Sequence, residues 1–240
     1  MHGQPMPSDG GTQVGLIVVE PTPSLLAIAA QKNIDFIVLD AEQTGLSVRE
    51  CTEIVHRMAG TDTEIAVRVP DVEERTLISF ANTGAAELVL PRIRSVAELE
   101  AAAAAVKYSP EGLRSRQVTL ASGFGVDYSR APRTSVLLET VDALDSIEAL
   151  VASPCFESGW VGPADLSAEL QRAGRGGEGA LEAATQTMVD AMLAAGKPVG
   201  LPAPGPAGVA SARARGATRV AVYWERYLHT VLEEISAQRS

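Results

Sequence analysis

Eight short runs of Val, Ile and Leu recur along the chain, and longer alanine-rich amphipathic segments separate them. Several runs are almost continuously hydrophobic, which is typical of parallel strands that are covered on both faces. The intervening segments have helical spacing, and one of them ends just before Gly196, a common helix stop. The pattern predicts strands at residues 14–20, 35–42, 64–70, 86–93, 135–141, 159–166, 198–204 and 219–225.

The number of runs and the chain length favour a closed barrel. Eight strand–helix units in 240 residues give 240/8, or roughly 30 residues each, which is what a βαβ unit needs. We expect one α/β domain, a (β/α)₈ TIM barrel at residues 14–240 with a C-terminal helix, after a flexible leader at residues 1–13. The alternative is a doubly wound open sheet, which usually has a glycine-rich turn after its first strand. Here that strand ends in EPTPS.

The composition excludes some classes of binding partner. The chain has 30 Asp and Glu against 20 Lys and Arg, a net charge of −10, and no basic run, so we expect no nucleic-acid partner. The apolar runs are too short to span a membrane, and the first residues lack the pattern of a signal peptide. These features predict a cytoplasmic protein without a membrane partner, in which Cys51 and Cys155 are free thiols.

Candidate chemistry lies where the expected strands end, because TIM-barrel active sites form there. Glu139 and Asp165 are 165 − 139 = 26 positions apart, about one strand–helix unit, so we expect them on neighbouring strands. Two such carboxylates suit a hard divalent cation such as Mg²⁺ or Mn²⁺, completed by water and substrate oxygens. Spacing alone supports equally well a helix cap at Asp165 and an ion pair at Glu139. The other polar residues at strand ends are Glu20, Asp40, Glu42, Arg68 and Arg92.

Arg68 closes the apolar strand AVRVP. Its guanidinium can hold a substrate carboxylate or a developing oxyanion, or it can pair with Asp40 or Glu42 on the preceding strand. The two roles are compatible. The turn GPAD at residues 162–165 adds backbone amides at the start of a helix, a common arrangement for binding a carboxylate.

Six segments, taken in order and spacing, resemble the HpcH/HpaI aldolase family, the metal-dependent pyruvate aldolases related to the citrate lyase β subunit. The resemblance implies a TIM barrel that cleaves or forms a carbon–carbon bond of a 4-hydroxy-2-oxoacid, with side activity in oxaloacetate decarboxylation. It also implies a divalent cation (Mg²⁺, Mn²⁺ or Co²⁺) and a homo-oligomer, either a hexamer built as a trimer of dimers or a trimer. The segments are GLIVVEPTPSLLAIAAQKNIDFIVLDAEQTG, AVRVP, NTGAAELVLPRIRSVAELEAA, YSPEGLRS, LLET and GWVGPADLS.

The same resemblance assigns roles to individual residues. Glu139 and Asp165 match the metal carboxylates, and Arg68 matches the arginine that stabilises the enolate. Asp40 and Glu42 match an acidic pair near metal-bound water. Contacts to the pyruvyl substrate are implied for Arg68 and for the turn and wall residues Gly162, Pro163, Ala164 and Leu201.

The chain departs from the family at two positions. Gln43 stands in D-A-E-Q where the family has a catalytic histidine, and Asn82 stands in A-N-T-G-A where it has the partner aspartate. An amide is no general base near pH 7, but two amides can keep a hydrogen bond between these positions. Decarboxylation needs no proton removal, so we expect it to survive better than aldol cleavage.

The sequence therefore predicts a metal-dependent carbon–carbon lyase that acts on a 2-oxoacid by aldol chemistry or by decarboxylation. Two alternatives are a non-catalytic 2-oxoacid-binding protein and a carbon–carbon bond enzyme repurposed for secondary metabolism. The long connections at residues 108–134 and 167–178 are expected to select the substrate tail.

Overall fold

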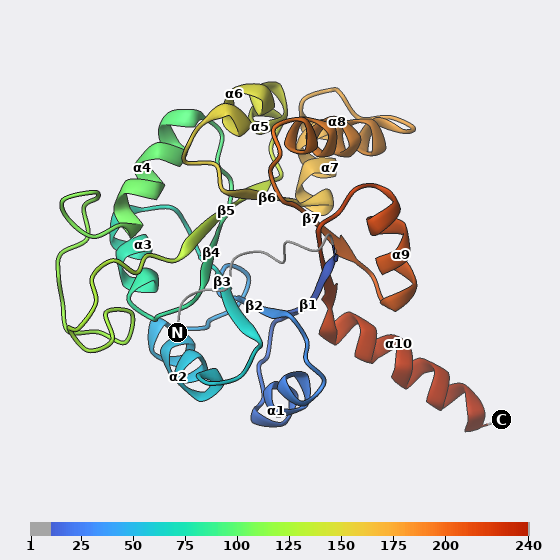
Figure 1. The fold of residues 1–240 in the computed structure, drawn as a ribbon. Coiled ribbons are helices and arrows are strands. Elements are labelled where there is room, and N and C mark those ends of the chain that lie inside the picture. Colours follow the sequence, from blue (N-terminus) through green and yellow to red (C-terminus); the bar gives the residue numbers. More distant parts are fainter. Residues whose placement is uncertain (1–10, 240) are drawn as a thin grey trace.

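A computed structural model describes residues 11–239 of the chain. Eight parallel strands form a closed barrel in sequence order, and the last strand pairs with the first (Figure 1). This confirms the predicted (β/α)₈ barrel, and each predicted strand overlaps an observed one. The strands are β1 (Gln13–Val18), β2 (Phe36–Asp40), β3 (Glu64–Arg68), β4 (Glu87–Leu90), β5 (Arg133–Leu138), β6 (Ser158–Val161), β7 (Val199–Ala203) and β8 (Arg219–Tyr223).

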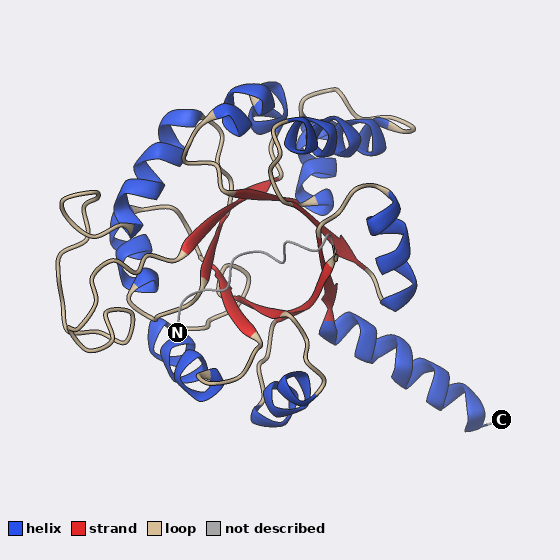
Figure 2. Cartoon of the chain, viewed as in Figure 1, coloured by secondary structure: helices blue, strands red, loops and turns tan. Residues whose placement is uncertain are grey.

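Most of the expected leader, residues 1–10, lies outside the described residues, and Gln13 already belongs to β1. Helices surround the ring of strands (Figure 2), and the main hydrophobic core fills the space between the two layers. They are α1 (Pro23–Gln31), α2 (Val48–Met58), α3 (Glu74–Ala81), α4 (Val96–Val106), α5 (Val141–Asp145), α6 (Ile147–Ala152), α7 (Pro163–Arg172), α8 (Ala180–Ala194), α9 (Pro206–Ala214), α10 (Trp224–Ser236) and the 3₁₀ helix η1 (Ala237–Arg239).

The two long connections differ in structure. Between α4 and β5 the chain is irregular and projects from the barrel wall (Figure 1). This connection leads into the start of β5, at the N-terminal end of the barrel, and not to the strand ends where TIM-barrel active sites form, so within one chain it does not meet the expectation that residues 108–134 select the substrate tail. Arg114 anchors it: the buried guanidinium lies 3.6 Å from the ring centroid of Tyr108 and donates a hydrogen bond to the carbonyl of Val106. The first half of the second connection, residues 167–178, belongs to α7, and a short irregular segment then leads to α8.

Helix α10 leaves the barrel after β8 and extends away from it (Figure 1). None of its residues is buried, and Leu228, Leu232 and Ile235 expose apolar side chains. Among residues 11–239, no helix is both long and apolar enough to cross a membrane.

The barrel interior is closed at its N-terminal end by a buried charged network. Glu87 and Arg219, the second of which is 2% exposed, begin β4 and β8 and are joined at 2.8 Å. Ser135 on β5 donates a hydrogen bond to the same carboxylate. The Arg219 guanidinium also stacks on Phe36 and Trp160, whose rings meet edge to face above it. The open space of the barrel is therefore confined to its C-terminal end.

Replacing Glu87 by Ala should destabilise the fold by about 3–5 kcal/mol, because Arg219 would remain buried without its counter-ion. Urea unfolding measures this loss. Glu53→Ala, which removes one partner of the exposed ion pair with Arg49, is the control and should change stability by less than about 1 kcal/mol. Equal effects of the two substitutions would contradict a structural role for the network.

Candidate active site

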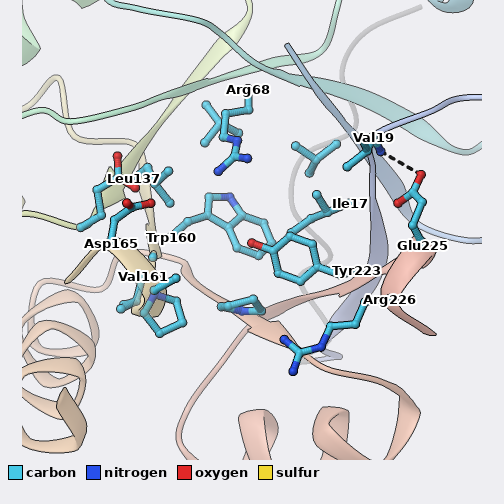
Figure 3. A pocket seen from close by; sticks show the side chains of 17 residues that line it. Ile17, Val19, Arg68, Leu137, Trp160, Val161, Asp165, Tyr223, Glu225 and Arg226 are labelled. Carbon is cyan, nitrogen blue, oxygen red and sulfur yellow. Dashed lines mark hydrogen bonds between the residues drawn. The ribbon is translucent and has the colours of Figure 1, made fainter. Parts of the chain in front are cut away.

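A cavity of about 370 Å³ opens at the C-terminal end of the barrel. Its floor and walls are largely apolar, with Trp160 in the middle and Ile17, Leu137 and Val161 around it (Figure 3). Polar groups line it from the ends of four strands, β3, β5, β6 and β8, or from the segments that directly follow them. They are Arg68, Glu139, residues 162–165, Tyr223, Glu225 and Arg226.

Arg68 is fixed by the carboxylate that ends the preceding strand. Its Nε lies 3.0 Å from Asp40 Oδ1 and its Nη2 lies 2.5 Å from Asp40 Oδ2, a two-pronged ion pair. Glu42 Oε2 is 3.4 Å from the same Nε. The predicted ion pair is thus present, and Arg68 still lines the cavity, where this fixed guanidinium can meet an anionic group.

Glu139 follows β5 and is almost fully buried, at 2% exposure. Burial, together with the negative charges of Glu42 and Asp165, raises the pKa of its carboxyl to about 7. The backbone N–H of Arg92 opposes this by donating to Oε1 at 3.0 Å. Arg92 holds that position with a left-handed φ of 54°, an uncommon backbone conformation for a residue with a side chain. Acidic side chains therefore crowd together at this end of the barrel.

The turn after β6 carries the second acidic side chain. Gly162 is the N-cap of α7 and has no side chain to cap it, so the N–H groups of Ala164 and Asp165 in the first turn remain available for an anion. A Cβ at position 162 would crowd Glu139, at 3.0 Å from its Cβ and 3.1 Å from its Oε2, so glycine suits this close approach. Close approach of the turn to Glu139 therefore brings both predicted carboxylates to one cavity wall.

These two carboxylates fit a hard divalent cation. Glu139 is buried next to like charge, which favours a bound positive ion over two unpaired anions. Among residues 11–239, no group of three or more His, Cys, Asp or Glu side chains is arranged around a metal position. The pair thus suits an ion that takes only one or two protein carboxylates and completes its shell with water and substrate, as Mg²⁺ does.

Gln43 and Asn82, the two amide residues, do not lie next to each other within one subunit. Gln43 is exposed beyond β2, where its backbone N–H donates to Asp40 Oδ1 at 3.1 Å and its side chain hydrogen-bonds Glu42. Asn82 ends α3, the helix that returns to the N-terminal end of the barrel, and lines a separate hollow beside α2. The Oδ1 atom of Asn82 has no hydrogen-bond partner among the described residues. The hydrogen bond expected between Gln43 and Asn82 is therefore not formed within one subunit.

Leu201, for which the resemblance implies a substrate contact, does not line the cavity. It packs in the core between strands and helices, while Pro202 lines the cavity. Neighbouring side chains of a strand point to opposite faces, and Gly200 faces inward, since a Cβ there would lie 2.3 Å from the Trp160 ring. Residue 202 must therefore point inward and residue 201 outward. The same alternation could have identified Tyr223 and Trp160, which sequence reasoning missed.

The raised pKa of Glu139 predicts how stability depends on pH without metal. In the unfolded chain this carboxyl ionises at about pH 4.3, whereas in the fold it keeps its proton until about pH 7. The stabilising effect of neutral Glu139 is thus complete below about pH 4 and is lost as pH rises to about 7. When the pH rises from about 5 to about 7.5 in EDTA, the free energy of unfolding should fall in both proteins. The fall should be smaller in Glu139→Gln than in the wild type, by on the order of 2 kcal/mol.

Urea unfolding at a series of pH values measures the difference. Glu53→Gln on the exposed face of α2 is the matched control and should follow the wild-type curve. Parallel curves for Glu139→Gln and the wild type would show that Glu139 ionises normally in the fold.

Comparison with known proteins shows the family to which this chain is similar. A family model described as HpcH/HpaI aldolase/citrate lyase matches residues 13–223. The pyruvate aldolase of Rhizobium etli is 28% identical over 202 residues, which cover 81% of this chain and 80% of that protein. The 5-keto-4-deoxy-D-glucarate aldolase of Shigella dysenteriae is 28% identical over 217 residues, covering 88% and 85% of the two chains.

A solved structure has the same fold. It is an HpcH/HpaI aldolase/citrate lyase family protein from Burkholderia cenocepacia, with a TM-score of 0.87 at 24% identity over 97% of this chain and 96% of that one. The family model spans all eight strands. The chain therefore belongs to the HpcH/HpaI aldolase/citrate lyase family and, like its named relatives, is a carbon–carbon lyase.

Proposed function

We propose that the chain is a metal-dependent lyase that breaks a carbon–carbon bond next to the oxo group of a 2-oxoacid. The observation that carries this proposal is the convergence of Glu139, Asp165 and Arg68 on one cavity beside the open N-terminus of α7. The small-molecule substrate presents a carboxylate and an oxo group, and the cavity offers amide donors and a guanidinium for these anionic oxygens.

In this proposal each residue of the cavity has a separate role. The N–H groups of Ala164 and Asp165 bind the substrate carboxylate, and Pro163 sets the first turn of the helix that presents them. Arg68, held rigid by Asp40, stabilises the negative charge that develops on the oxo oxygen as the bond breaks. The apolar walls exclude water, which strengthens both interactions.

Glu139 and Asp165 would hold the divalent cation, Mg²⁺, Mn²⁺ or Co²⁺, which when bound supplies Lewis acidity and a template for the oxoacid. Glu42 lies behind Arg68, and burial raises the pKa of its carboxyl, with Arg68 and Arg92 opposing that shift. It can therefore share a proton with nearby water. This provides a weak route for a hydroxyl proton in aldol cleavage.

The lack of a histidine at position 43 favours decarboxylation. When a carboxylate leaves as CO₂, no proton needs to be removed, whereas aldol cleavage requires a base for the C4 hydroxyl. Gln43 cannot be that base, and Asn82 does not reach it within one chain. Any joint action of Gln43 and Asn82 would require a second subunit.

Kinetics with Mg²⁺ or Mn²⁺ test this proposal. The wild type should decarboxylate oxaloacetate faster than it cleaves a 4-hydroxy-2-oxoacid. Gln43→His should raise aldol cleavage by at least about tenfold, because a positioned base contributes about 10²–10⁴-fold, and should leave decarboxylation nearly unchanged. Adding Asn82→Asp should raise cleavage further only if the two positions meet between subunits.

Glu53→His, which places a histidine on an exposed helix face, is the control and should change neither rate. Rapid aldol cleavage by the wild type that persists in Gln43→Ala would contradict the argument about the missing base. Metal-dependent binding of 2-oxoacids without turnover would instead favour a binding protein.

We also propose that the chain is a homo-oligomer, a hexamer or a trimer, in which α10 packs on a neighbouring subunit. This is supported by the exposed apolar residues Leu228, Leu232 and Ile235, which no part of the described chain covers. Leu232→Asp combined with Ile235→Asp should reduce the mass measured by light scattering toward that of the monomer. His229→Gln on the same helix is the control. An unchanged mass for the double variant would contradict this role of α10.

A further inference from the structure

Tyr223 occupies a place in the cavity that neither the family match nor the sequence motifs explain. It is the last residue of β8, where it pairs with Ile17 of β1, and its side chain lines the cavity. Figure 3 shows its hydroxyl group pointing into the cavity, toward the side where Asp165 lies and below Arg68. The phenol therefore faces the space in which the substrate carbon chain would lie.

The hydroxyl group is free to donate its hydrogen. No hydrogen bond from Tyr223 Oη is formed within the described part of the chain, although Arg68, Asp40, Asp165 and Glu139 are all close enough to act on it electrostatically. Burial raises the pKa of this phenol; Arg68 opposes the shift, and the three carboxylates add to it. Tyr223 therefore keeps its proton at neutral pH, as a proton donor must.

The other ionisable groups of the cavity have different tasks. Both arginines keep their protons at all ordinary pH values, so neither is a proton donor. Under the proposed function Glu139 and Asp165 hold the cation. Glu225 Oε1 accepts hydrogen bonds from two backbone N–H groups beside β1, at 2.9 and 3.0 Å, which ties that carboxylate to the wall. Tyr223 remains as the neutral group with an available proton.

We propose that Tyr223 is a catalytic residue that protonates C3 of the pyruvate enolate after the C3–C4 bond has broken. The inference rests on the proposed function. The electron pair of the broken bond stays on the enolate, the O–H bond of Tyr223 breaks and a C3–H bond forms. The tyrosinate, which Arg68 stabilises, then regains a proton from solvent at the cavity mouth. An enolate carbon is a far stronger base than a phenolate, so this proton transfer is downhill.

The experiment follows the configuration of the new C–H bond. With Mg²⁺ in D₂O, the wild type should convert 2-oxo-3-methylbutanedioate to 2-oxobutyrate whose deuterium has a single configuration at C3, because one fixed donor delivers it to one face. Tyr223→Phe should give deuterium of mixed configuration, because solvent now reaches both faces. Its kcat for formation of the keto product should also fall by about 10²-fold or more.

Two controls separate the outcomes. Tyr227→Phe, at a tyrosine that packs against the outer core, should retain both the single configuration and kcat. Mg²⁺-dependent oxalate binding should be unchanged in Tyr223→Phe, which shows that the cavity is intact. A single configuration and an unchanged kcat in Tyr223→Phe would overturn the role of Tyr223 alone. Absence of Mg²⁺-dependent CO₂ release from the wild type would overturn the proposed function, and the role of Tyr223 with it.

Discussion

The site depends on repulsion among acidic side chains at the C-terminal end of the barrel. Glu42 and Asp165 both act on Glu139 there, and Arg68 and Arg92 offset part of this negative charge from within the fold. Burial makes the arrangement costly, which is why the pKa of Glu139 rises to about 7. A bound divalent cation would relieve this repulsion, and it would also place positive charge where an anionic 2-oxoacid needs it. The same repulsion therefore supports both the proposed metal site and the proposed substrate class.

The rest of the barrel supports this arrangement. The buried pair of Glu87 and Arg219 closes the N-terminal end, and Trp160, which fits only because residue 200 is glycine, forms the floor. The cavity therefore lies at the end of the barrel where the strands deliver their polar residues. Gly162 lets the turn approach Glu139 closely. The residues that stabilise the fold and those proposed to carry the chemistry thus lie at opposite ends of one barrel, as is usual for this fold.

Much of this was predictable from the sequence. The eight apolar runs gave the barrel, and the spacing of Glu139 and Asp165 correctly placed both on one cavity, because neighbouring strands of a barrel end side by side. A family resemblance does not show which face of a strand a residue occupies, and strand alternation places Leu201 in the core and Pro202 in the cavity. Asn82 was paired with Gln43 by family resemblance alone, and a linear motif does not show that α3 carries Asn82 to the other end of the barrel.

The most direct test of the central claim is the binding of Mn²⁺ to the intact protein, followed by electron paramagnetic resonance. The account predicts one Mn²⁺ per chain in the wild type, with binding weakened by at least about tenfold in Asp165→Asn because one of two carboxylate ligands is lost. Equal binding of Mn²⁺ by the wild type and by Asp165→Asn would contradict it.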